Sequence, residues 1–116
     1  MNGERTIDDA LQDMAATILK VQKFVEGVTY QEFAANEEKI FAPIRALEII
    51  GEAAKKIPDS IRADYADIPW RAVAGMRDKL IHEYFGVNLN MVWQTIQEDL
   101  PQVHTVVMRI LNDRGH

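Results

Sequence analysis

Residues 6–25 read TIDDALQDMAATILKVQKFV, and their apolar side chains recur with the period of an α-helix. The apolar positions are separated by alternating steps of four and three residues: Ile7, Leu11, Met14, Ile18, Val21 and Val25. A seam of this kind packs along another helix. The sequence therefore predicts a helix that begins at Thr6, as its N-cap, and stops at Gly27. We expect the seam to pack inside a helical bundle, and a seam between two copies of the chain is the alternative.

The helical period continues along nearly the whole chain, and no segment alternates apolar and polar residues as a strand would. Further helices are expected at about 29–35, 37–57, 61–65, 69–85 and 89–111. Thr29 and Glu32 have the spacing of a capping box at the start of the first of these. Pro43 should kink its helix or delay the regular part until after Phe41, and Pro101 should kink or divide the last helix. The predicted fold is an all-α, up-and-down bundle.

The composition fits one globular domain spanning residues 1–116. Apolar residues make up 47% of the chain and charged residues 27%, close to the averages of globular proteins. The absence of cysteine excludes disulfides, thiolate metal ligands and a thiolate nucleophile. No apolar run reaches the roughly 20 residues needed to cross a bilayer, and residues 1–5 lack the apolar segment of a signal peptide, so a cytoplasmic protein is expected. The net charge of −5 argues against binding of nucleic acid by bulk charge; basic residues outnumber acidic ones only within 45–79.

The helix expected at 37–57 has two distinct faces. Its apolar face should join the core: Ile44, Leu47, Ile50, Ala54 and Ile57. A second strip carries charges of both signs at helical spacing: Arg45, Glu48, Glu52 and Lys55. A solvated ladder of weak ion pairs is the expected role of this strip, and a face that lines a functional site is the alternative.

The helix expected at 69–85 has charged residues in unusual places. On a helical wheel started at Trp70, Arg77 falls in the middle of the apolar arc. A guanidinium is rarely buried without a partner. We therefore expect Arg77 to bind a carboxylate or a phosphate, or to lie in a cleft. Asp78 and His82 are four residues apart on the flank of the arc, where the carboxylate could orient or charge the imidazole. Two interpretations stay open: Arg77 pairs with an acid such as Glu48 and His82 is a surface histidine, or this helix lines a reactive cleft.

The segment from Arg77 to Tyr84 reads RDKLIHEY, which has the form R-x4-H-x-Y. It is preceded by IPWR at residues 68–71 and by GM at residues 75–76, and it is followed by FGV at residues 85–87. Farther upstream, residues 45–54 read RALEIIGEAA. These blocks, in this order, resemble a HepT-like protein of the HEPN superfamily, and the resemblance covers nearly the whole chain.

The resemblance implies a HEPN-type helical domain, usually a homodimer, in which Arg77 and His82 form a metal-independent ribonuclease site. It also implies a toxin–antitoxin pair in which the antitoxin is a minimal nucleotidyltransferase (MNT) that adds AMP to Tyr84. The residue types suit this chemistry, because an imidazole can take the proton of a ribose 2′-hydroxyl and a guanidinium can stabilise the charged phosphorane. Asp78 would orient or charge His82.

Two other classes of function compete with this one. A non-catalytic helical module that docks a nucleotidyltransferase is the alternative, and the acidic net charge favours it modestly. No cofactor or metal is expected, because the chain lacks a pair of histidines four residues apart with a nearby carboxylate. His104 and His116 are expected to be a helix-surface residue and a tail residue. The partners expected are therefore RNA, a second copy of the chain and the nucleotidyltransferase, with no membrane.

Overall fold

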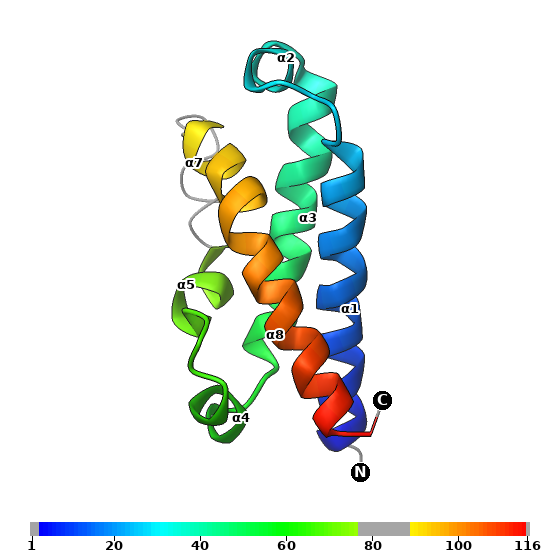
Figure 1. Cartoon of the computed structure of the whole chain (residues 1–116), viewed down its shortest axis with the longest axis vertical. Coiled ribbons are helices and arrows are strands. Elements are labelled where there is room, and N and C mark those ends of the chain that lie inside the picture. Colours follow the sequence, from blue (N-terminus) through cyan, green and yellow to red (C-terminus); the bar gives the residue numbers. More distant parts are fainter. Residues whose placement is uncertain (1–2, 77–88, 116) are drawn as a thin grey trace.

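The computed structural model describes residues 3–76 and 89–115, and all the regular elements within them are helical. The elements are α1 (Gly3–Phe24), α2 (Tyr30–Ala35), α3 (Glu37–Lys55), α4 (Asp59–Asp64), α5 (Trp70–Ala74), α7 (Leu89–Gln94), the π-helical turn η2 (Thr95–Asp99) and α8 (Leu100–Asp113). The long helices α1, α3 and α8 pack together, with α2 at one end of the bundle and α4 and α5 along one edge (Figure 1). The all-α bundle is confirmed. None of the described helices is long and apolar enough to cross a membrane.

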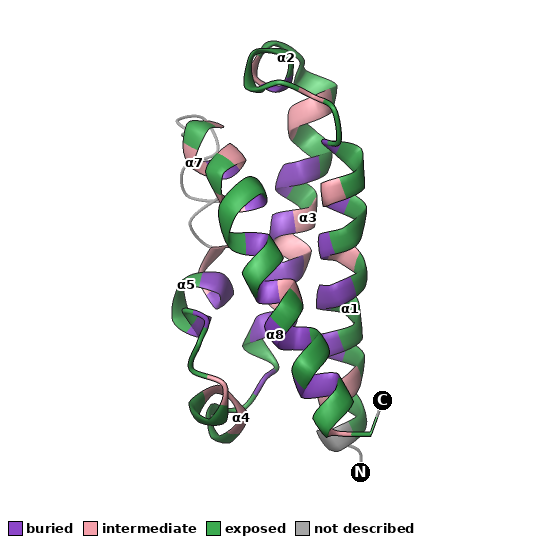
Figure 2. Cartoon of the chain, viewed as in Figure 1, coloured by how far each residue is buried: buried purple, intermediate pink, exposed green. Residues whose placement is uncertain are grey.

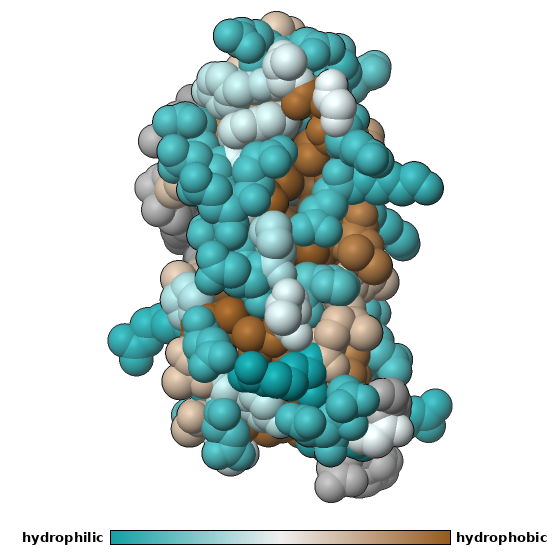
Figure 3. All heavy atoms as spheres, viewed as in Figure 1, coloured by the Kyte–Doolittle hydropathy of each residue, from teal (hydrophilic) through white to brown (hydrophobic). Residues whose placement is uncertain are grey.

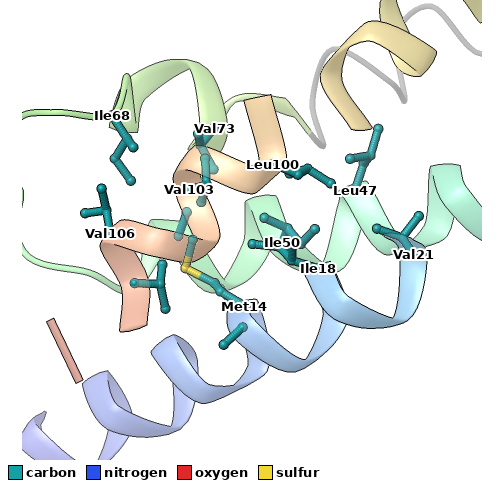
Figure 4. Close-up of a cluster of buried hydrophobic side chains, with 14 of the residues drawn as sticks. Met14, Ile18, Val21, Leu47, Ile50, Ile68, Val73, Leu100, Val103 and Val106 are labelled. Atoms are coloured by element: carbon teal, nitrogen blue, oxygen red, sulfur yellow. The ribbon is translucent and has the colours of Figure 1, made fainter. Parts of the chain in front are cut away.

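The seam of α1 packs inside this chain, against α3 and α8. Its central residues Leu11, Met14 and Ile18 are completely buried. Figure 4 shows Met14 and Ile18 among core side chains contributed by α3, α5 and α8, and Figure 2 shows the buried stripe turned toward the bundle axis. Burial of each large aliphatic side chain contributes about 1.5–3 kcal/mol. The expectation of bundle packing is therefore confirmed for this seam.

The ends of α1 differ from the prediction. The helix begins at Gly3, so Thr6 lies inside it and is not the N-cap. The helix ends at Phe24, and Gly27 has the positive φ of 75° with which the chain turns away.

The junction between α2 and α3 is built from two side-chain caps. The Thr29 hydroxyl accepts from the Glu32 backbone N–H at 3.1 Å, and the Glu32 carboxylate accepts from the Thr29 N–H at 3.2 Å, which confirms the capping box. The hydrogen bond from the Thr29 backbone N–H lowers the pKa of the Glu32 carboxyl below its ordinary value. Asn36 then caps α3, because its side-chain oxygen accepts from the N–H groups of Glu38 and Lys39.

α3 starts directly at Glu37 and runs through Pro43, so the expected delay of its regular part until after Phe41 was wrong. Pro43 removes one backbone donor, whereas the Asn36 cap satisfies two others and fixes the start of the helix. The predicted core face is confirmed, since all of its members are buried: Ile44, Leu47, Ile50, Ala54 and Ile57. α4 begins at Asp59, two residues before the expected start at Ile61.

The helix expected at 69–85 is interrupted within its described part. α5 ends at Ala74, and Gly75 is its C-cap, with its N–H bonded back to the Arg71 carbonyl at 2.9 Å. Glycine weakens a helix interior because its backbone loses more entropy on folding. The helical wheel that placed Arg77 in an apolar arc assumed one unbroken helix from Trp70, and Arg77 itself lies outside the described residues.

The last helix is divided just before Pro101, as the sequence predicted. The π turn η2 separates α7 from α8, and the Leu100 N–H bonds to the Thr95 carbonyl, five residues earlier. Proline lacks the N–H that would bond to the carbonyl of Gln97, so a change of hydrogen-bond pattern is expected here. The apolar side of the three segments stays continuous, and Val92, Ile96 and Leu100 are all buried.

Candidate functional site

The motif residues Arg77, Asp78, His82 and Tyr84 lie outside the described residues. The structure instead describes the chain on both sides of them. Met76 and Leu89 are half-buried and pack against the hydrophobic core. Met76 lies just after α5, and Leu89 is the first residue of α7. Both helices lie along the same edge of the bundle (Figure 1).

The chain that leads into α5 is held by hydrogen bonds to the backbone. Arg62 donates from Nε to the Ile57 carbonyl at 2.9 Å and from Nη2 to the Ala54 carbonyl at 2.8 Å. It thereby adds hydrogen bonds to carbonyls in the last turn of α3 and just after the end of this helix. The indole N–H of Trp70 donates to the Tyr65 carbonyl at 2.8 Å, while the Trp70 ring is buried. These contacts position α5 against α3.

The same loop is also tied to α8. The Tyr65 hydroxyl donates to Oδ2 of Asp113 at 2.6 Å, and Arg109 pairs with Asp67 at 3.1 Å. The Arg109 guanidinium lies 5.4 Å from the centre of the Tyr65 ring, within the range of a cation–π contact. The hydrogen bond to Asp113 raises the pKa of the Tyr65 phenol above its ordinary value. The loop between α4 and α5 is thus fixed on two sides.

A cavity of about 480 Å³ lies between α5, η2 and α8. Its apolar wall is formed by eight side chains: Ile68, Pro69, Ala72, Val73, Met76, Met91, Leu100 and Val103. Figure 4 shows Val73 of α5 and Val103 of α8 among the residues that meet here, and Figure 3 shows hydrophobic side chains at the surface between these two helices. Met76 directly precedes Arg77 in the sequence. The cavity therefore adjoins, along the chain, the motif that the sequence singles out.

Three polar side chains also line this cavity: Thr95, Asp99 and Gln102. Thr95 donates its hydroxyl proton to the Met91 carbonyl at 2.8 Å, so only its oxygen lone pairs remain. The Gln102 amide donates one weak hydrogen bond, of 3.4 Å, to the Glu98 carbonyl. Asp99 is exposed and its side chain does not cap α8. The cavity thus combines apolar walls with a carboxylate that is open to a ligand.

The charged strip on α3 behaves as a ladder of ion pairs. Arg45 pairs with Glu48 and Lys55 with Glu52, both at 3.9 Å between nitrogen and oxygen. Exposed pairs of this kind contribute about 0.2–1 kcal/mol. These contacts favour the solvated-ladder interpretation.

His104 is not the surface residue that the sequence predicted. It is half-buried on α8, and its Nε2 is enclosed with no hydrogen-bond partner in the described part of the chain. The prediction failed because His104 follows Val103, on the edge of the buried face of α8. His116 lies outside the described residues. Within residues 3–76 and 89–115, no three histidine or acidic side chains gather as a metal site would require.

The polar residues of the cavity were missed by the sequence analysis, although a signal for them exists. Met91, Thr95, Asp99 and Gln102 are separated by steps of four, four and three residues, which places them on one strip of a helix. This strip flanks the buried face of the helix, so in the sequence it resembles a solvent-exposed helix flank. Only the position of α5 shows that it lines a cavity. The break at Gly75, which decides where α5 ends, was also not predicted.

Comparisons with known proteins identify the family. The model of the family described as "Ribonuclease HepT-like" matches residues 14–110. A protein of Thermococcus cleftensis named "Probable ribonuclease HepT" is 44% identical over 100 residues, which cover 86% of this chain and 91% of the relative. A protein of Methanocaldococcus jannaschii named "Putative RNase MJ0125" is 42% identical over 110 residues, which cover 95% of each chain.

A third relative, from Caldanaerobacter subterraneus and named "Putative RNase TTE0752", is 45% identical over 87 residues, or 75% of this chain and 78% of the relative. No solved structure matches the chain. The family match covers most of the sequence, and it includes all of the blocks that carried the resemblance. The chain therefore belongs to the ribonuclease HepT-like family.

Proposed function

We propose that this protein is an endoribonuclease that cleaves RNA without a metal ion and acts as the toxin of a HEPN/MNT toxin–antitoxin pair. The observation that carries the proposal is the R-x4-H-x-Y motif, from Arg77 to Tyr84, in a chain of the ribonuclease HepT-like family. Relatives named as ribonucleases match most of the length of the chain and support the ribonuclease part.

In the proposed reaction, His82 takes the proton of a ribose 2′-hydroxyl, and the 2′-oxygen attacks the adjacent phosphorus. The bond from phosphorus to the 5′-oxygen breaks, and that oxygen takes up a proton. The products are a 2′,3′-cyclic phosphate and a 5′-hydroxyl. Arg77 binds the phosphate and stabilises the added charge of the phosphorane, since its fork matches two phosphate oxygens. Imidazole suits the proton transfer because it titrates near neutral pH.

A homodimer completes the proposed site. One histidine cannot readily serve as base and acid in the same turnover, whereas two copies supply two histidines. Asp78 precedes His82 by four residues and acts as a positioning residue that orients or charges the imidazole. Neither His104 nor His116 belongs to the R-x4-H-x-Y motif.

Control by an MNT antitoxin is the second part of the proposal. The Tyr84 oxygen attacks the α-phosphate of ATP, a new O–P bond forms, pyrophosphate leaves, and the phenolic proton passes to solvent. The AMP adds negative charge two residues after His82, where it competes with RNA for Arg77. Intact mass after incubation with the partner, ATP and Mg²⁺ should rise by one or more AMP units, and Tyr84→Phe should abolish the gain. A toxin that is silenced without modification would overturn this part.

A non-catalytic module that docks a nucleotidyltransferase is the second candidate. The net charge of −5 favours it, because RNA binding usually draws on positive charge. A cleavage assay on purified variants separates the two functions. Removal of one transition-state contact typically costs about 10²–10³-fold in rate, so His82→Ala and Arg77→Ala should each abolish measurable cleavage.

Two matched variants control for the loss of an imidazole and of a guanidinium. His104→Gln removes the other internal histidine, and Arg71→Ala removes an exposed arginine of α5. Both should keep cleavage and helicity at the wild-type level. Equal activity of wild type and His82→Ala would support the docking module and overturn the ribonuclease proposal.

A further inference from the structure

The cavity between α5, η2 and α8 has the size and the lining residues of a base-binding site. We propose that it binds a guanine base of the RNA substrate, and that Asp99 is the residue that recognises it. This inference rests on the proposed ribonuclease function and assigns a base preference to it.

The size and the walls of the cavity favour an uncharged, flat ligand. Its volume of about 480 Å³ lies within the range of about 300–1,000 Å³ typical of small-molecule pockets. Met76 and Met91 contribute flexible, polarisable side chains that adapt to a ring, and Leu100 contributes a branched apolar surface. A phosphate would lose its hydration against these walls, whereas the face of a nucleobase gains from contact with them.

Asp99 supplies the selectivity. An ionised carboxylate offers two acceptor oxygens and no donor, and that of Asp99 forms no hydrogen bond or ion pair with the described residues. Its best partner is a ligand with two adjacent donors. Guanine is the only one of the four RNA bases with this arrangement, N1–H beside the exocyclic N2 amino group. Adenine and cytosine place a ring acceptor beside their amino group, and uracil places its single N–H between two carbonyls.

The two other polar side chains of the cavity fit the same base. Gln102 uses one amide N–H for the Glu98 carbonyl, so its second N–H can donate to guanine O6. The Thr95 hydroxyl donates its hydrogen bond to the Met91 carbonyl, so its oxygen lone pairs can accept one from the exocyclic amino group of guanine. The acidic group also repels phosphate, so the base enters the cavity while the sugar–phosphate chain stays outside.

The position of the cavity links base recognition to cleavage. Met76 in its wall is followed in the sequence by Arg77, the residue proposed to bind the scissile phosphate. A guanosine held in the cavity would lie against Met76, one residue before Arg77 in the chain. Cleavage should consequently occur beside guanosines.

Binding of nucleosides by the full-length protein tests this inference without relying on cleavage. Guanosine, inosine and adenosine are titrated into the protein and followed by NMR chemical shifts. Inosine is the matched ligand, because it lacks only the N2 amino group of guanosine. A bidentate contact to a base gives roughly ten- to hundredfold discrimination, so guanosine should bind at least tenfold more tightly than the other two nucleosides.

Two protein variants test whether the Asp99 carboxylate is responsible for guanosine binding. Asp99→Asn should lower the affinity for guanosine at least tenfold, and it should leave the fold intact because the Asp99 side chain does not cap α8. Glu98→Gln removes the neighbouring exposed carboxylate, which does not line the cavity, and should leave guanosine binding unchanged. As a second probe of the cavity, Ala72→Phe fills it from an exposed position of α5 and should also abolish binding.

The outcomes separate this inference from the proposed function. His82→Ala should lose cleavage and still bind guanosine. Asp99→Asn should still cleave RNA but lose the preference for guanosine at the cut site. Equal affinity for all three nucleosides, no guanosine binding at millimolar concentration, or preference for an amine such as spermidine would overturn the guanine site. Guanosine binding by a protein that cuts no RNA would instead overturn the ribonuclease.

Discussion

Arg114 donates a hydrogen bond from Nε to Oδ1 of Asp8 over 2.6 Å, and so joins the end of α8 to the first turns of α1. The two side chains are only 24% and 22% exposed. Arg114→Ala should lower the free energy of unfolding by about 1 kcal/mol, because a charge-assisted bond is lost at a partly buried site. Urea denaturation measures the change. Arg45→Ala is the matched control: the Arg45 side chain is 70% exposed and lies 3.9 Å from Glu48, so the loss of this longer, more exposed pair should cost no more than a few tenths of a kcal/mol.

The contact between Tyr65 and Asp113 predicts a pH dependence at the alkaline end. The neutral phenol donates the hydrogen bond, so the bond raises the pKa of Tyr65. Its stabilising contribution is fully present below the ordinary pKa of a phenol and is lost as the pH rises through the raised value in the folded protein. Phenolate absorbance is measured against pH for wild type and for Tyr65→Phe. The difference between the two curves should give the pKa of Tyr65. Asp113→Asn should shift the titration to lower pH, and an unchanged titration would contradict the role of the bond.

Phe33 holds α2 against the rest of the bundle. Its side chain is completely buried, and its ring centre lies 5.1 Å from that of Trp93 and 6.4 Å from that of Tyr30. Phe33→Ala should lower the free energy of unfolding by about 3–5 kcal/mol. Phe33→Leu retains most of the volume and should cost much less. Equal effects of the two variants in thermal or urea unfolding would contradict tight packing at this site.

Self-association follows from the proposed two-histidine chemistry. Light scattering at micromolar concentration should give the mass of a homodimer. In a mixture, His82→Ala and Arg77→Ala protomers should restore some activity if residues of both copies serve one site. A monomer that cleaves RNA at the full rate would rule out a site completed by a second copy.

The parts of the fold that depend on short-range patterns could be predicted from the sequence. The seam of α1 and the capping box of Thr29 and Glu32 are fixed by residues close together in the chain, and both are present. The interruption before Pro101 followed from its missing N–H. These features require no knowledge of which helices meet.

Features set by tertiary packing were harder to predict. Gly75 ends α5 after a single short helix, although the apolar period of the sequence continues past it. The wheel for residues 70–85 assumed one unbroken helix, whereas the spacing of the motif did not depend on that assumption and correctly indicated the family. The cavity beside Asp99 is lined by residues of α5, η2 and α8, and no local pattern encodes how these elements meet.

Cleavage of RNA by the wild-type protein in excess EDTA tests the central claim most directly, provided that the ends of the products are analysed. If His82 and Arg77 perform the reaction, EDTA should leave the rate unchanged, and the products should carry 2′,3′-cyclic phosphate and 5′-hydroxyl ends. His82→Ala should produce neither product under the same conditions. Cleavage that stops in EDTA and returns with Mg²⁺, or that leaves 5′-phosphate ends, would contradict the account.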